Sequence, residues 1–182
     1  MLLSAYLVSA VAALFGADEG ETLKRFFTEF AGKRDVVTTL QAPFTQRTIT
    51  PDETVTSTGT VIYARPRRLM FRYSDPRQVY LLDGGRAYEY DAELQQVQVF
   101  DLEDSRQSAA FYLGFEDDID SLVEANEIRL LIDDETGDIA VELTPKEPDE
   151  EDAFFQRATI HLRKADFVPT EIHIVNDEES ET

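Results

Sequence analysis

Apolar and polar residues alternate along much of the middle of this chain, most regularly in residues 58–90. There Leu69, Phe71 and Tyr73 take every second position. A period of two is typical of β-strands, because successive side chains point to opposite faces of a sheet. Asp83-Gly84 and similar pairs interrupt the pattern with residues that favour tight turns. The stretch therefore predicts short strands joined by turns, with one face rich in aromatic side chains.

The same alternation continues on both sides of this stretch. Turn residues separate the alternating segments about every eight to twelve positions, which is the spacing of an antiparallel meander. The predicted strands cover residues 43–49, 55–64, 68–74, 78–82, 86–91, 95–101, 128–132, 139–143, 153–162 and 168–175.

A helical period replaces the alternation near the start of the chain, in residues 22–35. The apolar residues there recur at spacings of three and four, which places them on one side of an amphipathic helix. They are Leu23, Phe26, Phe27 and Phe30. A stripe this rich in phenylalanine must cover either a sheet face or the mouth of a cavity.

Residues 105–126 also depart from the strand pattern. Gly114 separates two short predicted helices, and Asp117 or Asp118 caps the second. With the first helix, this gives about three helices beside one long antiparallel sheet. Because a sheet of this length curls, we expect an α+β fold, an incomplete, open antiparallel barrel whose helices form a lid over a hydrophobic cavity.

The first residues differ from the rest, because residues 1–17 carry no charged side chain. Their apolar run is short for a membrane span, and Ala13 and Ala17 offer cleavage positions. We interpret residues 1–17 as an export signal peptide, although no Lys or Arg precedes the run. A first core helix is the alternative. Residues 18–182 then form a single domain.

The formal net charge is −20, and the chain contains no cysteine. Nucleic acid is thereby excluded as an expected partner, since phosphate binding needs a basic face. Anionic membrane surfaces should also repel the protein. The absence of cysteine is compatible with an oxidising compartment, and it excludes a lipid anchor attached through an N-terminal thioether.

No pattern of catalytic or metal-binding residues is evident. The acidic clusters lie in predicted turns and helix starts, where solvated carboxylates are common. The run 133–138 is interpreted as a hairpin turn, since it lacks the ligand spacing of a calcium loop. His161 and His173 alternate with apolar neighbours and should point to the polar side of their strands. We therefore expect no enzyme activity, no cofactor and no metal.

Large apolar side chains on alternate strand positions form the most distinctive group. They are Leu69, Phe71, Tyr73, Tyr80, Leu82, Tyr88 and Tyr90. Residue type alone leaves open whether they form an ordinary sheet core or line a ligand site. Arg65 precedes Pro66 and so ends a strand in extended conformation. A surface position is the ordinary expectation for such an arginine.

The order of several short motifs resembles that of the outer-membrane lipoprotein carrier family, LolA and its relatives. The motifs are Phe44-Thr45-Gln46, the stretch 59–90 with its Arg65-Pro66, Leu143-Thr144-Pro145 and the strand ending at Asn176. The resemblance implies a periplasmic carrier of acylated lipoproteins, expected to act as a monomer. Its partners would be an ATP-driven lipoprotein-release transporter in the inner membrane and a receptor lipoprotein in the outer membrane.

The resemblance also assigns roles to residues. It implies that Arg65 points inward and donates hydrogen bonds to backbone carbonyls of the helical lid, a role that suits the guanidinium fork. It further implies that the apolar strand residues line the acyl-chain cavity and that aromatic residues of the helices form the lid. The full expected set is Arg65, Leu69, Phe71, Tyr73, Tyr80, Leu82, Tyr88, Tyr90, Phe26, Phe30 and Phe111.

Two features depart from the family pattern. Tyr88 stands where tryptophan is frequent, and no further strand follows Asn176, which suggests a chain truncated at its C-terminus. Two other functions therefore stay open. One is a LolA-like half-barrel that senses lipid or binds a regulatory partner protein in the periplasm. The other is a hydrolase with two facing carboxylates.

Overall fold

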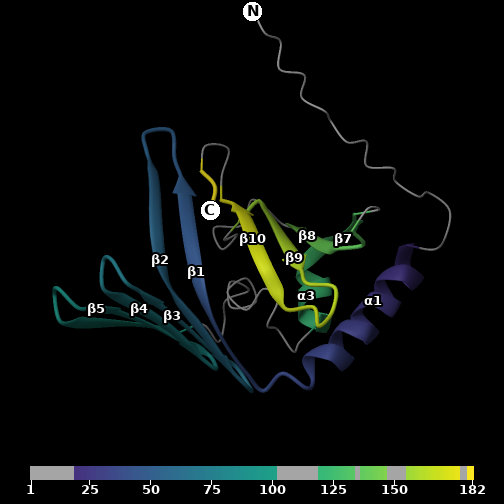
Figure 1. Cartoon of the computed structure of the whole chain (residues 1–182), viewed down its shortest axis with the longest axis horizontal. Coiled ribbons are helices and arrows are strands. Elements are labelled where there is room, and N and C mark those ends of the chain that lie inside the picture. Colours follow the sequence, from purple (N-terminus) through teal and green to yellow (C-terminus); the bar gives the residue numbers. More distant parts are fainter. Residues whose placement is uncertain (1–18, 102–118, 134–135, 147–154, 177–179) are drawn as a thin grey trace, which may run out of the picture.

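The computed structural model describes residues 19–101, 119–133, 136–146, 155–176 and 180–182 (Figure 1). Two helices are described, α1 (Glu19–Arg34) and α3 (Ile119–Ala125). The strands are β1 (Thr39–Ile49), β2 (Thr54–Ala64), β3 (Arg68–Tyr73), β4 (Gln78–Asp83), β5 (Arg86–Asp91), β6 (Gln96–Asp101), β7 (Asn126–Ile132), β8 (Ile139–Pro145), β9 (Arg157–Leu162) and β10 (Pro169–Val175).

The strands form two antiparallel sheets in which neighbours in sequence are neighbours in space. Strands β1 to β6 form a six-stranded meander in chain order. The other sheet has four strands in the order β10-β9-β8-β7. Turn chemistry explains the tight connections. Gly84 and Gly137 adopt positive φ angles of 63° and 70° in the β4–β5 and β7–β8 hairpins, a conformation that glycine adopts without steric cost.

The last residues of the chain join the two sheets. Glu181 pairs with Ile49 at the end of β1 and with Val175 at the end of β10. The amide and carbonyl of Ile49 exchange hydrogen bonds with Glu181 at 2.8 Å and 3.0 Å. Thr182 exchanges bonds with Ile174 at 2.7 Å and 2.6 Å. The two sheets therefore meet at this rung, and Figure 1 shows β1 and β10 diverging below it.

This rung also defines which faces of the two sheets correspond. Ile49, Glu181 and Val175 stand in one row, so their side chains share one face, which we call the outer face. The opposite, inner face carries the buried residues of both sheets. Ile160 and Leu143 lie on it in the four-stranded sheet, and Leu69 and Leu82 lie on it in the six-stranded sheet. The apolar faces are thus two parts of one bent surface.

Helix α1 covers the inner face of the four-stranded sheet (Figure 1). Phe26 and Phe30 are 7% and 8% exposed, as expected for the apolar stripe of an amphipathic helix. They pack with Phe167 from the β9–β10 turn, whose ring centroid lies 5.6 Å from Phe26 and 6.1 Å from Phe30. The same core includes Val141, Leu143, Phe155, Ala158, Ile160 and Leu162, with Ile119 and Leu122 of α3 packed against it.

A second, smaller core lies on the inner face of the six-stranded sheet. Tyr63, Leu69 and Leu82 are its buried members, from β2, β3 and β4. They occupy adjacent positions, because Tyr63 pairs with Leu69 and Leu69 pairs with Leu82. Leu40, Val61, Phe71 and Ala87 pack against them. This core lies near the end of the sheet where α1 is connected to β1.

The prediction of an open, mostly antiparallel fold is confirmed. The strands form two sheets that are joined at residue 181. The described residues contain two helices, and the first helix predicted in 105–126 lies outside them. The second is α3, directly after Asp117 and Asp118. The helix predicted at 22–35 begins at Glu19.

Strand boundaries agree with the prediction to within two residues, with two exceptions. β1 begins at Thr39, four residues earlier than predicted, because Leu40 and Ala42 pair with β2. β9 begins at Arg157 instead of 153. The predicted signal peptide, residues 1–17, lies outside the described residues. Within the described part of the chain, no helix is long and apolar enough to cross a membrane.

Candidate binding face and its helix contacts

Aromatic side chains form a connected group on the inner face of the six-stranded sheet. Phe44 of β1 stands edge-on to Phe71 and Tyr73 of β3, with ring centroids 5.7 Å and 5.1 Å apart. Tyr73 in turn stands edge-on to Tyr80 of β4 at 5.6 Å. Edge-to-face contacts at these distances are favourable for aromatic pairs. The rings therefore extend an apolar surface across four neighbouring strands.

Gly59 makes this contact between β1 and β3 possible. It lies on β2 between Phe44 and Tyr73, which are its partners in the two flanking strands. A Cβ atom at Gly59 would approach Phe44 Cε1 to 2.7 Å and would also clash with the carbonyl oxygen of Arg72. Because glycine has no side chain, the ring of Phe44 can lie over β2 and reach Tyr73.

Polar groups border the aromatic surface. The Tyr73 hydroxyl donates to Gln46 Oε1, and the Tyr80 hydroxyl donates to Glu89 Oε1 at 2.9 Å. Burial and the hydrogen bond to Glu89 raise the pKa of Tyr80 to about 12. Burial also raises the pKa of Tyr73. Both phenols are thus neutral hydrogen-bond donors at physiological pH.

Arg65, directly after β2, links the sheet to the end of α1. Its Nη1 donates to the backbone carbonyl of Asp35 at 2.9 Å, and its Nη2 donates to Asp35 Oδ1 at 3.0 Å. Asp35 directly follows the last residue of α1. The guanidinium therefore points to the helix end. The backbone amide of Arg65 also donates to Thr38 in the α1–β1 connection, at 3.0 Å.

Arg34, the last residue of α1, joins the two cores. It is only 5% exposed. Its guanidinium carbon lies 5.8 Å from the ring centroid of Phe30 in the first core and 5.8 Å from that of Tyr63 in the second. At these distances a guanidinium is attracted to an aromatic face. Through Arg34 the end of α1 thus contacts Tyr63 of β2, while Phe30 of the same helix packs in the core of the four-stranded sheet.

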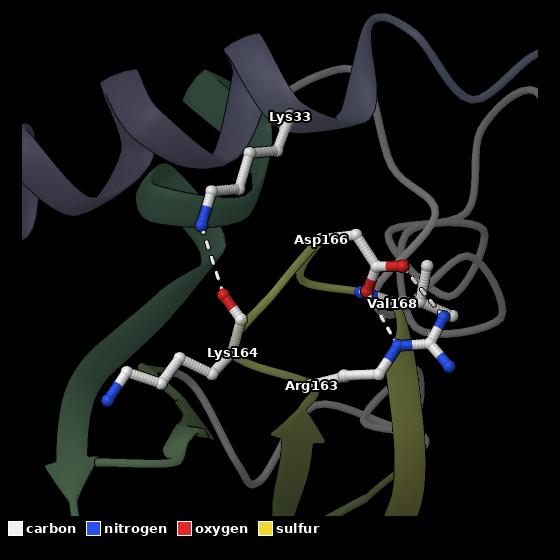
Figure 2. A network of polar contacts seen from close by, with 5 residues as sticks. All are labelled: Lys33, Arg163, Lys164, Asp166 and Val168. Atoms are coloured by element: carbon white, nitrogen blue, oxygen red, sulfur yellow. Dashed lines mark hydrogen bonds and ion pairs between the residues drawn. The ribbon is translucent and has the colours of Figure 1, made fainter.

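Lys33 fixes the same helix to the β9–β10 turn (Figure 2). Its Nζ donates to the carbonyl of Lys164 at 3.0 Å and lies 3.9 Å from the ring centroid of Phe167. It also lies 3.1 Å from a carboxylate oxygen of Glu29, one turn earlier on α1. The ammonium therefore combines a hydrogen bond, an ion pair and a cation–π contact.

The β9–β10 turn is itself held in shape by Arg163 and Asp166 (Figure 2). The guanidinium donates to both carboxylate oxygens, at 2.8 Å and 2.7 Å, and the amide of Val168 donates to Asp166 Oδ1 at 3.2 Å. The hydrogen bond from Arg163 lowers the pKa of Asp166. These bonds place Phe167, at a φ of 55°, under the rings of α1.

The structure brings together five of the predicted strand residues. Leu69, Phe71, Tyr73, Tyr80 and Leu82 share the inner face, because Leu69 pairs with Leu82 and Phe71 pairs with Tyr80. Their contact with a ligand stays a prediction.

The expectation that Tyr88 and Tyr90 share this face is wrong. Tyr88 pairs with Leu81 and Tyr90 pairs with Val79, and both partners lie on the outer face. The two-residue turn Gly84-Gly85 sets this register, so even-numbered residues of β4 oppose odd-numbered residues of β5. Glu89, which lies between the two tyrosines, is the residue that points inward.

The predicted lid residues differ in their placement. Phe26 and Phe30 lie in the core between α1 and the four-stranded sheet, and Phe111 lies outside the described residues. Sequence reasoning did not select Arg34, Lys33, Gln46 or Glu89. Glu89 could have been found from the length of the β4–β5 turn. No local signal distinguishes Arg34 from the exposed arginines of the chain.

The two histidines lie on the outer face, as predicted. His161 is exposed, and His173 Nε2 lies 3.1 Å from Glu181 Oε2. Asp133 closes the β7–β8 hairpin through backbone hydrogen bonds with Asp138 and Gly137. Among the described residues, no three His, Cys, Asp or Glu side chains are grouped closely enough to hold a metal ion.

Residues 35–182 match the family described as outer membrane lipoprotein carrier protein LolA. The chain belongs to the LolA family. An outer-membrane lipoprotein carrier protein of Methylibium petroleiphilum is 36% identical over 100 residues, which are 53% of this chain and 45% of that protein. The match therefore spans about half the length of this relative.

Solved structures also resemble the chain. One is a domain of an outer membrane lipoprotein-sorting protein from Vibrio parahaemolyticus, with 15% identity and a TM-score of 0.46, covering 85% of this chain and 72% of that chain. Another is a LolA superfamily protein from Nitrosomonas europaea, with 13% identity and a TM-score of 0.40, covering 84% of this chain and 72% of that one.

Proposed function

We propose that this LolA-family protein is exported and carries acylated lipoproteins across the periplasm. In this proposal residues 1–17 are removed as a signal peptide. An ATP-driven transporter of the inner membrane loads the cargo, and a receptor lipoprotein of the outer membrane takes it over. The acyl chains lie against the inner face of the six-stranded sheet, and the protein performs no chemical step.

The need for such a carrier follows from the cost of exposing hydrocarbon to water. Burying one methylene group gains about 0.8 kcal/mol, so burying all the acyl chains of a lipoprotein would gain tens of kcal/mol of free energy. Non-covalent affinities do not exceed about 20 kcal/mol. A carrier that must also release its cargo therefore uses part of the gain to displace its own contacts.

The observation that carries the proposal is the Arg65–Asp35 contact beside an apolar inner face. Helix α1 is attached to the six-stranded sheet through polar and cation–π contacts made by Arg65 and Arg34. Such contacts can open and reform without exposing a large apolar core. In the proposed cycle, cargo binding separates α1 from the sheet, and the return of Arg65 to Asp35 favours release. The family membership supports the same role.

Native mass spectrometry of the protein purified from the periplasm tests the proposal. The expected result is a co-purifying lipid or lipoprotein that is lost when Phe71, on the inner face, is changed to alanine. Tyr90→Ala is the matched control, because Tyr90 lies on the outer face of the same sheet and should keep the ligand. Urea unfolding of both variants shows whether they are folded.

Absence of any acyl-bearing ligand in the wild-type protein, under conditions that keep lipoproteins intact, would exclude the carrier function. A co-purifying partner protein without lipid would instead favour the regulatory half-barrel.

A further inference from the structure

The inner face of the six-stranded sheet changes character along its strands. At the end near α1, Leu69, Leu82 and Ala87 stand side by side on β3, β4 and β5. At the opposite end of the same strands stand Tyr73, Gln78 and Asp91. The change has the same direction in each strand. The face is therefore apolar near the helix connection and polar at the far end.

The polar end is also acidic. Glu89 and Asp91 of β5 both lie on the inner face, since Glu89 pairs with Tyr80 and Asp91 pairs with Gln78. By register, the inner face of these six strands carries no Lys or Arg. The arginines within the strands all lie on the outer face; they are Arg47, Arg68, Arg72 and Arg86. The segregation gives this end of the inner face a negative charge.

Glu89 is held in place at the boundary between the two parts. The Tyr80 hydroxyl donates to its Oε1 at 2.9 Å, and Glu89 has no ion-pair partner among the described residues. Asp91 Oδ1 accepts from the amides of Glu93 and Leu94 at 2.8 Å and 3.0 Å, which fixes it at the β5–β6 turn. Both carboxylates thus have fixed positions next to the aromatic surface.

We infer that this face selects acyl ligands whose polar end is neutral or cationic and rejects those that end in a carboxylate or phosphate. The inference rests on the proposed binding of acyl chains. The hydrocarbon lies over Phe71 and Ala87, which are half-buried on the apolar part of the face, and the polar end lies beside Glu89. A hydroxyl or amide there can donate to the carboxylate. An anionic end would meet a fixed like charge at the edge of an apolar surface, where water screens it poorly.

The test compares two ligands with the same chain and different ends, monolauroylglycerol and laurate, at pH 8. Each displaces a neutral fluorescent acyl probe from the full-length protein. We expect wild-type protein to bind monolauroylglycerol at least tenfold more tightly than laurate. Glu89→Gln should raise the affinity for laurate about tenfold and so bring the ratio of the two affinities close to one. Glutamine keeps an oxygen that accepts from Tyr80.

Glu93→Gln is the charge-matched control, since Glu93 lies four residues further on, in the exposed β5–β6 turn. It should change neither affinity. Equal binding of both ligands by wild-type protein, or preference for laurate, would overturn the inference while leaving the carrier function intact. Equal effects of Glu89→Gln and Glu93→Gln on the affinity for laurate would also overturn the inference and leave the carrier function intact. Failure of wild-type protein to bind either ligand would instead contradict the proposed function.

Discussion

Arg65 donates one hydrogen bond to the backbone carbonyl of Asp35 and a second to its carboxylate, at 2.9 Å and 3.0 Å. The two residues are thirty positions apart in the chain and connect the end of β2 to the end of α1. Because the guanidinium fork offers two parallel donors, one arginine engages both acceptors at once. This geometry makes Arg65 the residue whose removal should change the coupling between helix and sheet most directly.

We expect Arg65→Leu to bind acyl ligands at least as tightly as wild-type protein and to release them more slowly. The reason is that the variant no longer gains the Arg65–Asp35 bonds, worth about 1 kcal/mol, when α1 returns to the sheet. Stopped-flow transfer of a fluorescent acyl probe to acceptor vesicles measures the release rate. Arg47→Leu, an exposed outer-face arginine of β1, is the control. Normal transfer by Arg65→Leu would remove the role assigned to this contact.

Gly59→Ala should lower the free energy of unfolding by about 1–3 kcal/mol, the usual cost of adding a methyl group to a filled site. The new Cβ would approach the Phe44 ring to 2.7 Å and would also clash with the Arg72 carbonyl. Urea unfolding monitored by circular dichroism gives the value. Gly32→Ala is the matched control, because nothing lies within 4 Å of a Cβ at that helical position. An equal urea midpoint for Gly59→Ala and wild type would show that Phe44 does not lie over β2.

The stability of the protein should fall as pH rises from about 10 to 12. The pKa of Tyr80 is raised from 10.0 to about 12 in the folded protein by burial and by Glu89. In that range the unfolded chain has lost the phenolic proton while the folded chain retains it, so raising the pH favours unfolding. Below pH 10 both states are protonated and the stabilising contribution is complete.

Urea midpoints measured at several pH values test this dependence. Tyr80→Phe should reduce the slope between pH 10 and 12, whereas Tyr88→Phe, on the outer face, should not. Glu89→Gln should also reduce the slope, because the carboxylate contributes to the raised pKa of Tyr80. If Tyr80→Phe and Glu89→Gln both keep the wild-type slope, the Tyr80–Glu89 hydrogen bond does not form in solution.

Lys33→Met should loosen α1 from the β9–β10 turn. It removes the hydrogen bond to Lys164 and the contact with the Phe167 ring, with an expected loss of about 1 kcal/mol. Amide hydrogen exchange of α1 measures the effect, which should be faster exchange confined to the helix. Lys24→Met on the same helix changes the same charge at an exposed position. Equal exchange in both variants would argue against the clamp at Lys33.

The sequence was sufficient to predict the strands and which side chains of one strand share a face. It was not sufficient to predict, for every pair of neighbouring strands, which of their side chains lie on the same side of the sheet. Leu69, Phe71 and Tyr73 share a face because side chains of a strand alternate, and this requires no tertiary information. Grouping Tyr88 with Tyr80 failed because a strand's phase relative to its neighbour depends on the turn between them. The two-residue Gly84-Gly85 turn contained that information.

The sequence by itself therefore determined the antiparallel strands, the aromatic stripe of α1 and the inward side of β3, because each depends on a local period of two or 3.6 residues. Only the tertiary structure decided that Glu181 joins the two sheets, that Arg34 is buried between Phe30 and Tyr63, and that Arg65 meets Asp35. These contacts join segments far apart in the chain. Their partners are set by how the sheets bend and where α1 ends, and no local pattern of residues encodes that.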